Sequence, residues 1–404
     1  MVLFRMFINL MSYRWITLFI VVLIEGLSGL GRSASFSPFL KDIVADLSVT
    51  MVQISFAYGI ANLCSGIALP YIGKAYDRWP VADFLRVFII GFGGAFITLG
   101  LLAYIKPSPL FSIILMTCAF IVIRMGVQTY MLTVRCMVGS WFVNRKEFAI
   151  GITTFLLASI ASLMPWLSVQ AHKHVVWYHF WLVFGICWVV CMSFLVKWVR
   201  KPDAPLIKKA VQSVSTDRTF LTKPAFWIVV MALFFKAFQN TGFAFHLIPI
   251  CQEYGTSKEQ VTRMLALTPL FTVTTVFIME RFRRAPAVAL FLLMDVALLK
   301  TTPYITHSYG IVLFGVLCGI YWGIRQIIAY VVVPKLFGVQ CIGAVNGWIS
   351  AAVCLGSATG PYFMARIHAV HSYHLAIVIL QAISIVLLFV WILFRHCFDE
   401  QKAE

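Results

Sequence analysis

Twelve long apolar stretches dominate the sequence and leave it few possible folds. Each is long enough to cross a bilayer, which takes about 20 apolar residues in a helix. The expected spans cover roughly residues 15–31, 51–72, 84–105, 110–134, 148–169, 176–196, 224–248, 260–279, 286–305, 309–333, 344–366 and 374–394. Lipid offers no hydrogen bonds to exposed backbone groups, so such stretches must be helices. A mean hydropathy of +0.91 and a 12% share of charged residues also indicate an all-α membrane protein.

The positions of the basic residues predict how these helices are oriented. The formal net charge is +17, with 32 lysine and arginine residues. When the N-terminus is placed inside, most of these residues fall in the cytoplasmic segments, as the positive-inside rule requires. The excess basic charge therefore sets topology and meets anionic lipid, and it does not indicate nucleic-acid binding. We expect both termini to be cytoplasmic.

A polar segment divides the spans into two sets of six. Residues 197–223 contain Pro202, Pro205 and a cluster of basic residues, which is typical of a cytoplasmic linker. We therefore expect a six-helix N-terminal bundle over residues 1–196. A six-helix C-terminal bundle with a short cytoplasmic tail should follow over residues 224–404.

The two halves also resemble each other in sequence. Two residue pairs of the first half recur at the same spacing in the second half: Gly151 and Pro165 as Gly347 and Pro361, and Glu25 and Pro38 as Lys236 and Pro249. Matched Gly, Pro and charged positions in corresponding spans favour an internal duplication, which is common in transporters.

A short charged segment, Gly73-Lys74-Ala75-Tyr76-Asp77-Arg78-Trp79-Pro80, is predicted to be a turn between the second and third spans. Its pattern G-K-x-x-D-R resembles the signature at this place in the major facilitator superfamily of transporters. That resemblance implies twelve transmembrane helices in two pseudo-symmetric six-helix halves, which alternate between inward- and outward-open states. It also implies that Gly73, Asp77 and Arg78 form a cytoplasmic latch between the halves. The alternative is a solvated turn with ordinary positive-inside charges.

Two further segments are similar to one group within that superfamily. The segment Trp141-Phe142-Val143-Asn144-Arg145-Lys146-Glu147-Phe148-Ala149-Ile150-Gly151 resembles the sequence that enters span 5 of the monocarboxylate and oxalate/formate transporters. The segments His246-Leu247-Ile248-Pro249 and Glu253-Tyr254-Gly255-Thr256-Ser257 resemble the turn after span 7 of the same group.

Five ionisable residues fall deep inside the expected spans: Glu25, Arg124, Lys236, Asp295 and Arg325. A charge at mid-span costs about 2.5–3.5 kcal/mol on insertion scales, and such residues are functional candidates by default. Helical spacing places four of them on polar stripes: Glu25 with Arg32, Arg124 with Gln128, Lys236 with Asn240, and Arg325 with Tyr321 and Trp322. The stripes lie on spans 1, 4, 7 and 10, which the resemblance implies line the central cavity. Asp295 lies in span 9, at the periphery of that fold, where we expect a structural or loop-facing role.

Arg124 and Arg325 lie at similar depth in equivalent spans. Arginine stays protonated in proteins and offers a planar fork that matches a carboxylate or phosphate. Two such groups facing one cavity would bind an organic anion, with Gln128 and Asn240 nearby, and Tyr321 and Trp322 would supply aromatic walls. The alternative is that each arginine is held by a glutamate, a helix end or backbone carbonyls and only ties helices together.

Glu25 and Lys236 occupy repeat-equivalent positions with opposite charge, and Arg32 shares the face of Glu25. These three residues are candidates for coupling or gating. Glu25 and Lys236 would then pair across the cavity as the halves move, or Glu25 would carry a coupling proton. A static ion pair between spans 1 and 7 is the alternative, because buried pairs are weakly diagnostic of function.

All but one of the nine histidines map to the outer side: His172, His174, His179, His246, His307, His368, His371 and His374. Histidine titrates near neutral pH and binds metals, so a pH- or metal-responsive outer surface is one interpretation. Polar residues at the membrane interface are the simpler one.

These patterns together predict a transporter and no enzyme, with no cofactor and no bound metal. No nucleotide-binding glycine–lysine loop is present, which disfavours ATP-driven transport. We expect a monomeric secondary transporter of a small organic anion, a carboxylate, in the plasma (bacterial inner) membrane, coupled to protons or working by exchange. Two alternatives are a proton-driven exporter of amphipathic or drug-like compounds and a non-transporting sensor with a transporter fold.

Overall fold

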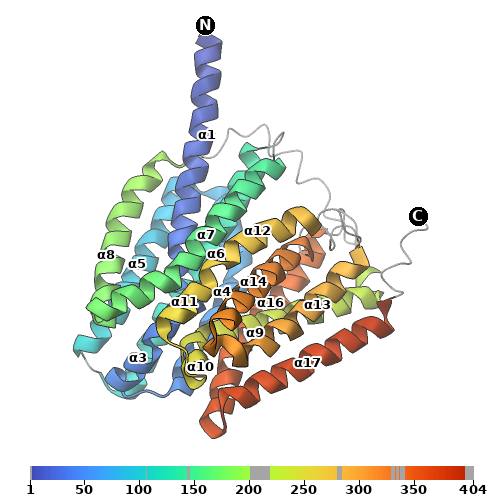
Figure 1. The fold of residues 1–404 in the computed structure, drawn as a ribbon. Coiled ribbons are helices and arrows are strands. Elements are labelled where there is room, and N and C mark those ends of the chain that lie inside the picture. Colours follow the sequence, from blue (N-terminus) through green and yellow to red (C-terminus); the bar gives the residue numbers. More distant parts are fainter. Residues whose placement is uncertain are drawn as a thin grey trace. The chain divides into compact units, whose positions relative to one another are not determined.

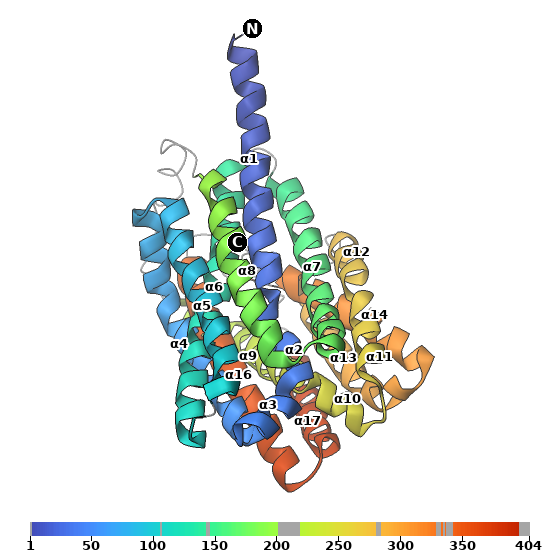
Figure 2. The same ribbon diagram turned by 90° about the vertical axis from the view of Figure 1, so that its left-hand side faces the viewer.

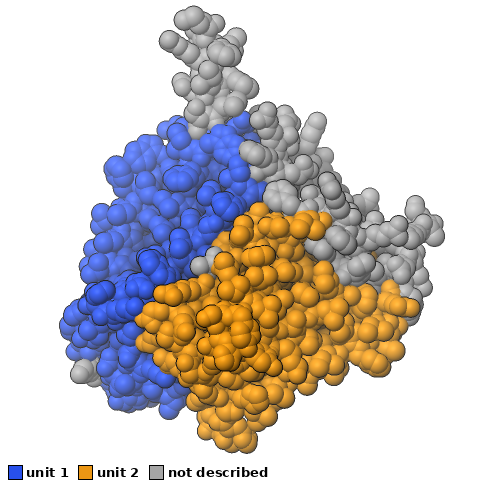
Figure 3. Space-filling view, in the orientation of Figure 1, with its two compact units in different colours: residues 1–210 blue, residues 211–404 orange. Residues whose placement is uncertain are grey.

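The computed structural model describes residues 2–105, 107–142, 146–200, 219–279, 284–328, 333, 336 and 342–395. Every regular element in these ranges is helical, which confirms the predicted fold class. The chain divides into two compact units, unit 1 over residues 1–210 and unit 2 over residues 211–404 (Figure 3). Most of the predicted linker, the basic segment at 280–283 and residues 143–145 lie outside the described residues.

Unit 1 contains six long helices and a group of short ones (Figure 1). In chain order the elements are α1 (Val2–Leu27), η1 (Ser28–Gly31), α2 (Ser33–Phe36), η2 (Ser37–Phe39), α3 (Leu40–Leu47), α4 (Met51–Arg78), α5 (Val81–Ile105), α6 (Pro109–Trp141), α7 (Lys146–His174), α8 (Trp177–Leu195) and η3 (Val196–Trp198).

Unit 2 follows a similar plan (Figure 2). Its elements are η5 (Thr219–Thr222), α9 (Pro224–Phe245), α10 (Leu247–Glu253), α11 (Lys258–Ala266), α12 (Thr268–Met279), α13 (Arg284–Thr301), η6 (Thr302–Thr306), α14 (Ser308–Ile327), α16 (Ile342–Val370) and α17 (Tyr373–Leu393).

Ten helices in the described ranges are long and apolar enough to cross a membrane. The eighth expected span, residues 260–279, is split between α11 and α12 at Leu267. Proline at residue 269 supplies the physical reason, because it has no backbone N–H to donate to the carbonyl four residues earlier. The eleventh expected span, residues 344–366, coincides with α16. Helices therefore occupy all twelve expected positions.

Polar side chains cap the starts of several helices. Thr50 caps α4 through a reciprocal pair of hydrogen bonds with Gln53, and Ser257 caps α11 in the same way with Gln260. Ser372 accepts a hydrogen bond from the first turn of α17. Such caps satisfy backbone N–H groups that a helix leaves without partners at its start.

The predicted turn at residues 73–80 is shorter than expected. α4 continues through the motif and ends at Arg78, and α5 begins at Val81, so only Trp79 and Pro80 connect the two helices. Gly73, Asp77 and Arg78 therefore lie on the last helical turns of α4. Proline fixes its own backbone and can start a helix, which allows a connection this short.

Glycines allow two pairs of helices to pack closely within the units. In unit 1, α5 lies against α8, and side chains added at Gly93 and Gly185 would collide with the facing backbone. In unit 2, α9 lies beside α16 (Figures 1 and 2), and the contact is made by Gly242, Gly356 and Gly360. Small residues at such positions are typical of helix contacts inside membranes.

The internal repeat extends to a histidine–carboxylate contact in each unit. In unit 1, Asp42 of α3 pairs with His172 at the end of α7, with 2.8 Å between the carboxylate and Nε2. In unit 2, Glu253 of α10 pairs with His368 near the end of α16, at 3.7 Å. Each carboxylate lies four residues after the repeated proline at 38 or 249, and each histidine lies seven residues after the one at 165 or 361. The two contacts are thus equivalent under the repeat and strengthen the case for duplication.

Candidate functional site

Unit 1 buries a carboxylate against an arginine from the same segment. Glu25, near the end of α1, is 2% exposed. Its Oε1 forms an ion pair with the Arg32 guanidinium, which follows η1. The second carboxylate oxygen, Oε2, has no hydrogen-bond partner among the described residues. The predicted shared face of Glu25 and Arg32 is therefore a direct contact, although the helix is interrupted between them.

A second arginine of unit 1 lies on a neighbouring tyrosine. Arg124 of α6 is half-buried, and its guanidinium carbon lies 5.6 Å from the centre of the Tyr58 ring on α4. Tyr58 is completely buried and interacts electrostatically with both Arg124 and Arg32. The Arg124 Nε has no hydrogen-bond partner in the part of the chain that the structure describes. A cation held mainly by an aromatic face keeps donors for another group.

In unit 2, a buried lysine lies over a tyrosine ring and interacts with a buried aspartate. Lys236 of α9 is 6% exposed, and its Nζ lies 3.1 Å from the centre of the Tyr321 ring on α14. Lys236 also interacts electrostatically with Asp295 of α13. The sequence placed Asp295 at the periphery, in a structural or loop-facing position, and the loop-facing alternative is wrong because this residue is 5% exposed. The helix that carries Asp295 has no stripe of polar residues, so helical spacing could not indicate that Asp295 lies near Lys236.

Arg325 of α14 completes the charged group of unit 2. Its guanidinium carbon lies 5.5 Å from the centre of the Trp322 ring, and the residue also acts electrostatically on Lys236. Of the residues in the predicted stripe, Tyr321 thus lies against Lys236 and Trp322 lies against Arg325. Both arginines singled out from the sequence lie against aromatic rings.

The two units thus contain charged groups of the same composition. Each has two cations, one buried carboxylate and one fully buried tyrosine: Arg32, Arg124, Glu25 and Tyr58 in unit 1, and Lys236, Arg325, Asp295 and Tyr321 in unit 2. The sequence pairs Glu25 with Lys236, whereas the structure gives each of them a partner of opposite charge in its own unit. Each group carries one positive charge in excess when all its members are ionised.

The remaining candidate residues have the following positions. Gln128 lies on α6 and Asn240 on α9, and both are partly exposed. Asp77 and Arg78 are exposed at the end of α4, and a side chain added at Gly73 would meet no atom of the described structure within 4 Å. Close packing inside unit 1 is therefore not the reason for a glycine at this position.

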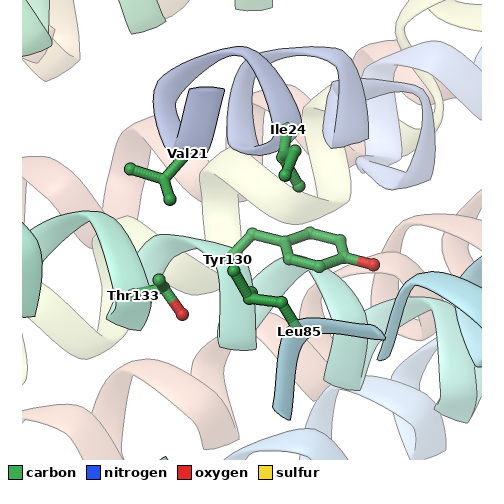
Figure 4. A pocket seen from close by; sticks show the side chains of 5 residues that line it. All are labelled: Val21, Ile24, Leu85, Tyr130 and Thr133. Carbon is green, nitrogen blue, oxygen red and sulfur yellow. The ribbon is translucent and has the colours of Figure 1, made fainter. Parts of the chain in front are cut away.

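A small apolar gap in unit 1 is not a substrate site. Val21 and Ile24 of α1, Leu85 of α5, and Tyr130 and Thr133 of α6 line it (Figure 4). It has no room for a water molecule. The Tyr130 hydroxyl donates a hydrogen bond to the carbonyl of Phe88 at 2.9 Å.

Metal binding finds no support in the described part of the chain. No group of three or more His, Cys, Asp or Glu side chains there is arranged to hold a metal ion. Two histidines of unit 2 make hydrogen bonds. His246 contacts the Pro361 carbonyl and the Tyr373 hydroxyl, and His374 contacts the Tyr254 hydroxyl.

Known proteins share this arrangement of helices. A sequence model of the Major Facilitator Superfamily matches residues 15–361. A bacterial homolog of the human lysosomal transporter Spinster, in an inward-facing and occupied conformation, is 15% identical, with a TM-score of 0.70 over 96% of this chain and 97% of that one. A D-xylose–proton symporter is 14% identical, with a TM-score of 0.73 over 94% and 97% of the two chains.

The nucleoside transporter NupG is also similar, at 14% identity, with a TM-score of 0.63 over 94% of this chain and 98% of that one. At these identities the likeness to solved structures concerns the fold alone. No curated protein sequence matches the chain.

Proposed function

The chain belongs to the major facilitator superfamily of transporters, and from this membership we propose that it moves a small organic anion, a carboxylate, across the membrane by alternating access. Transport would be secondary, driven by a proton gradient or by exchange of one anion for another. The protein would reside as a monomer in the plasma (bacterial inner) membrane, with both termini in the cytoplasm.

One observation carries the choice of an anion: Arg124 and Arg325 are half-buried inside membrane helices, and each lies over an aromatic ring. A guanidinium group stays charged at this depth, and a permanent cation in a low-dielectric environment favours binding of an anion. Its planar fork matches a carboxylate better than a lysine would. Gln128 and Asn240 would add polar contacts, and Tyr321 and Trp322 would exclude water from the bound anion.

Three further residues would couple or gate the movement of the substrate: Glu25, Arg32 and Lys236. Their charges are buried or partly buried in the membrane-spanning parts of the units, where a change of partner has a large electrostatic effect. Gly73, Asp77 and Arg78 would form the cytoplasmic latch between the two halves. Their exposed position at the end of α4 leaves Asp77 and Arg78 available for such a contact.

The test is binding and flux of small carboxylates with the purified protein. We expect lactate, oxalate or succinate to raise the melting temperature in detergent and to enter proteoliposomes, because a ligand that binds only the folded state stabilises it. Arg124→Gln and Arg325→Gln should each weaken binding about 10- to 100-fold, which corresponds to the loss of a charge-assisted hydrogen bond of about 1.5–3 kcal/mol. Arg124→Lys and Arg325→Lys, which keep the charge and lose the fork, should have intermediate effects.

Arg86→Gln is the matched control, because Arg86 forms an exposed ion pair with Asp83 on α5. It should bind and transport the carboxylates normally. Normal transport by the folded Arg124→Gln and Arg325→Gln variants would refute the assignment of the arginines. Stabilisation only by cationic or neutral amphiphiles would refute the anion and favour an exporter of such compounds.

A further inference from the structure

Two buried residues of opposite charge in unit 2, Lys236 of α9 and Asp295 of α13, interact electrostatically, and none of the contacts discussed for the substrate uses this interaction. We infer that Asp295 is the proton-binding group of the transport cycle, and that Lys236 controls whether this carboxyl group is charged. This inference rests on the proposed function, because it names the coupling group of an anion transporter.

The surroundings of Asp295 leave one carboxylate oxygen available for a proton. The Ser384 hydroxyl of α17 donates a hydrogen bond of 2.6 Å to Oδ2, and Gln239 of α9 also interacts with the carboxylate. The other oxygen, Oδ1, is buried and has no hydrogen-bond partner among the described residues. An unsatisfied buried oxygen costs free energy, and a bound proton would neutralise the group that carries it.

Lys236 is held in a way that allows it to change partners. Its Nζ lies 3.1 Å from the centre of the Tyr321 ring, which also stacks on Phe291 of α13 at 4.9 Å. Besides Asp295, the titratable and charged groups that act on Lys236 are Cys318 and Arg325, both on α14. A cation–π contact is not directional like a hydrogen bond to a carboxylate, so the ammonium group can move toward another anion without losing every interaction.

The charge balance of this group couples an anion to a proton. Lys236 and Arg325 are two cations beside one carboxylate, so the group carries one positive charge, and it keeps that charge when a monoanion and a proton bind together. An anion that draws Lys236 toward itself removes the cation that makes a buried carboxylate tolerable. Asp295 Oδ1 then takes a proton from the aqueous phase from which the anion arrives. When the anion leaves on the other side, Lys236 returns to Asp295 and the proton is released there.

Asp295 fits this role better than Glu25, the other buried carboxylate. Glu25 is paired with Arg32, seven residues later in the same segment, and the guanidinium does not deprotonate. The cation that acts on Asp295, Lys236, lies on a different helix. Movement of α9 relative to α13 therefore changes the electrostatic environment of Asp295 and leaves the pairing of Glu25 intact.

Transport of one monoanion with one proton moves no net charge. In proteoliposomes with the wild-type protein, we expect radiolabelled lactate to accumulate when an inward proton gradient is imposed, and a potassium diffusion potential alone to have no effect. Asp295→Asn should lose this gradient-driven accumulation and keep counterflow, the exchange of labelled for unlabelled lactate. Asp83→Asn, which changes an exposed aspartate of α5, should behave like the wild type in both assays.

Two results would overturn the inference. One is gradient-driven accumulation by Asp295→Asn at the wild-type level, and the other is loss of both counterflow and accumulation in the folded Asp295→Asn protein. If the wild-type protein transports none of lactate, oxalate and succinate, the result would instead contradict the proposed transport of a small carboxylate. The proton-binding role is then tested without any substrate.

Infrared difference spectra of the purified full-length protein between neutral and acidic pH supply that second test. Protonation of Asp295 should produce a carbonyl band of a carboxylic acid that is lost in Asp295→Asn. Ser384→Ala removes only the hydroxyl that bonds this carboxyl group, so it should shift the frequency of the same band. The Ser384→Ala variant also allows the spectrum to be tested if the Asp295→Asn protein does not fold. A spectrum that is identical in the wild type and both variants would show that Asp295 does not bind a proton and would overturn the inference.

Discussion

Replacing Gly360 with leucine is expected to force α16 away from α9 and to leave little folded protein in the membrane. A Cβ atom at this position would overlap the carbonyl oxygen of Phe238 on α9, and one at Gly356 would overlap that of Phe234. Overpacking costs about 1–3 kcal/mol where side chains can adjust. Here the obstacle is helix backbone, so we expect the cost to reach or exceed the upper end of that range.

The measurement is the yield of monodisperse protein in detergent and its melting temperature. Gly360→Ala should show a smaller loss than Gly360→Leu, because it adds only the Cβ. Gly347→Leu is the matched control, since Gly347 lies on the same helix and a Cβ there would meet no atom of the described structure within 4 Å. Equal yields and melting temperatures for Gly360→Leu and Gly347→Leu would contradict the close helix contact.

The second large effect is expected for Arg32→Gln, which leaves the Glu25 carboxylate buried without its cation. Glu25 is 3% exposed in its side chain, whereas Arg32 is 32% exposed. Removing one partner of a buried ion pair costs about 3–5 kcal/mol because the remaining charge is uncompensated. We therefore expect a marked fall in the melting temperature of the purified protein.

Neutralising both partners should restore much of this loss, because Glu25→Gln with Arg32→Gln leaves no isolated charge. Arg86→Gln again provides the comparison. The Arg86–Asp83 pair is exposed, and such pairs contribute about 0–1 kcal/mol. If Arg32→Gln and Arg86→Gln lower the melting temperature equally, the buried pair does not stabilise unit 1 in the way that its geometry indicates.

The repeat in the sequence leads to a repeat in the charged groups, but with altered chemistry. Glu25 and Lys236 are equivalent positions, yet one is the carboxylate and the other the cation of its unit. Unit 2 compensates with Asp295, which comes from a helix whose counterpart in the first half, α5, has charged residues only near its start. Duplication followed by such a change lets one unit keep a fixed pair, Glu25 with Arg32, and the other a pair formed between two helices.

Several predictions depended only on local sequence and were accurate for that reason. A stretch of about 20 apolar residues is helical in lipid whatever its neighbours are. The stripe of Tyr321, Trp322 and Arg325 follows from helical spacing, and so does the place of Arg124 on the polar face of α6. The motif at residues 73–80 was identified by its pattern, but its conformation was not, because Gly73 and Asp77 are compatible with both a turn and the end of a helix.

The partners of the buried charges required the tertiary structure. Lys236 and Asp295 are far apart in the sequence, and they come close enough to interact because α13 packs against α14 and α17 while α17 also touches α9. Helical spacing relates residues within one helix and carries no information about which helix lies opposite. The sequence alone thus determined the class of protein, the number of spans, the family and the residues that carry charge into the membrane. Helical spacing placed Arg32 on the face of Glu25, but only the packing of helices decided that Lys236 lies near Asp295, because the energy of a buried charge depends on the distance to its nearest counter-charge.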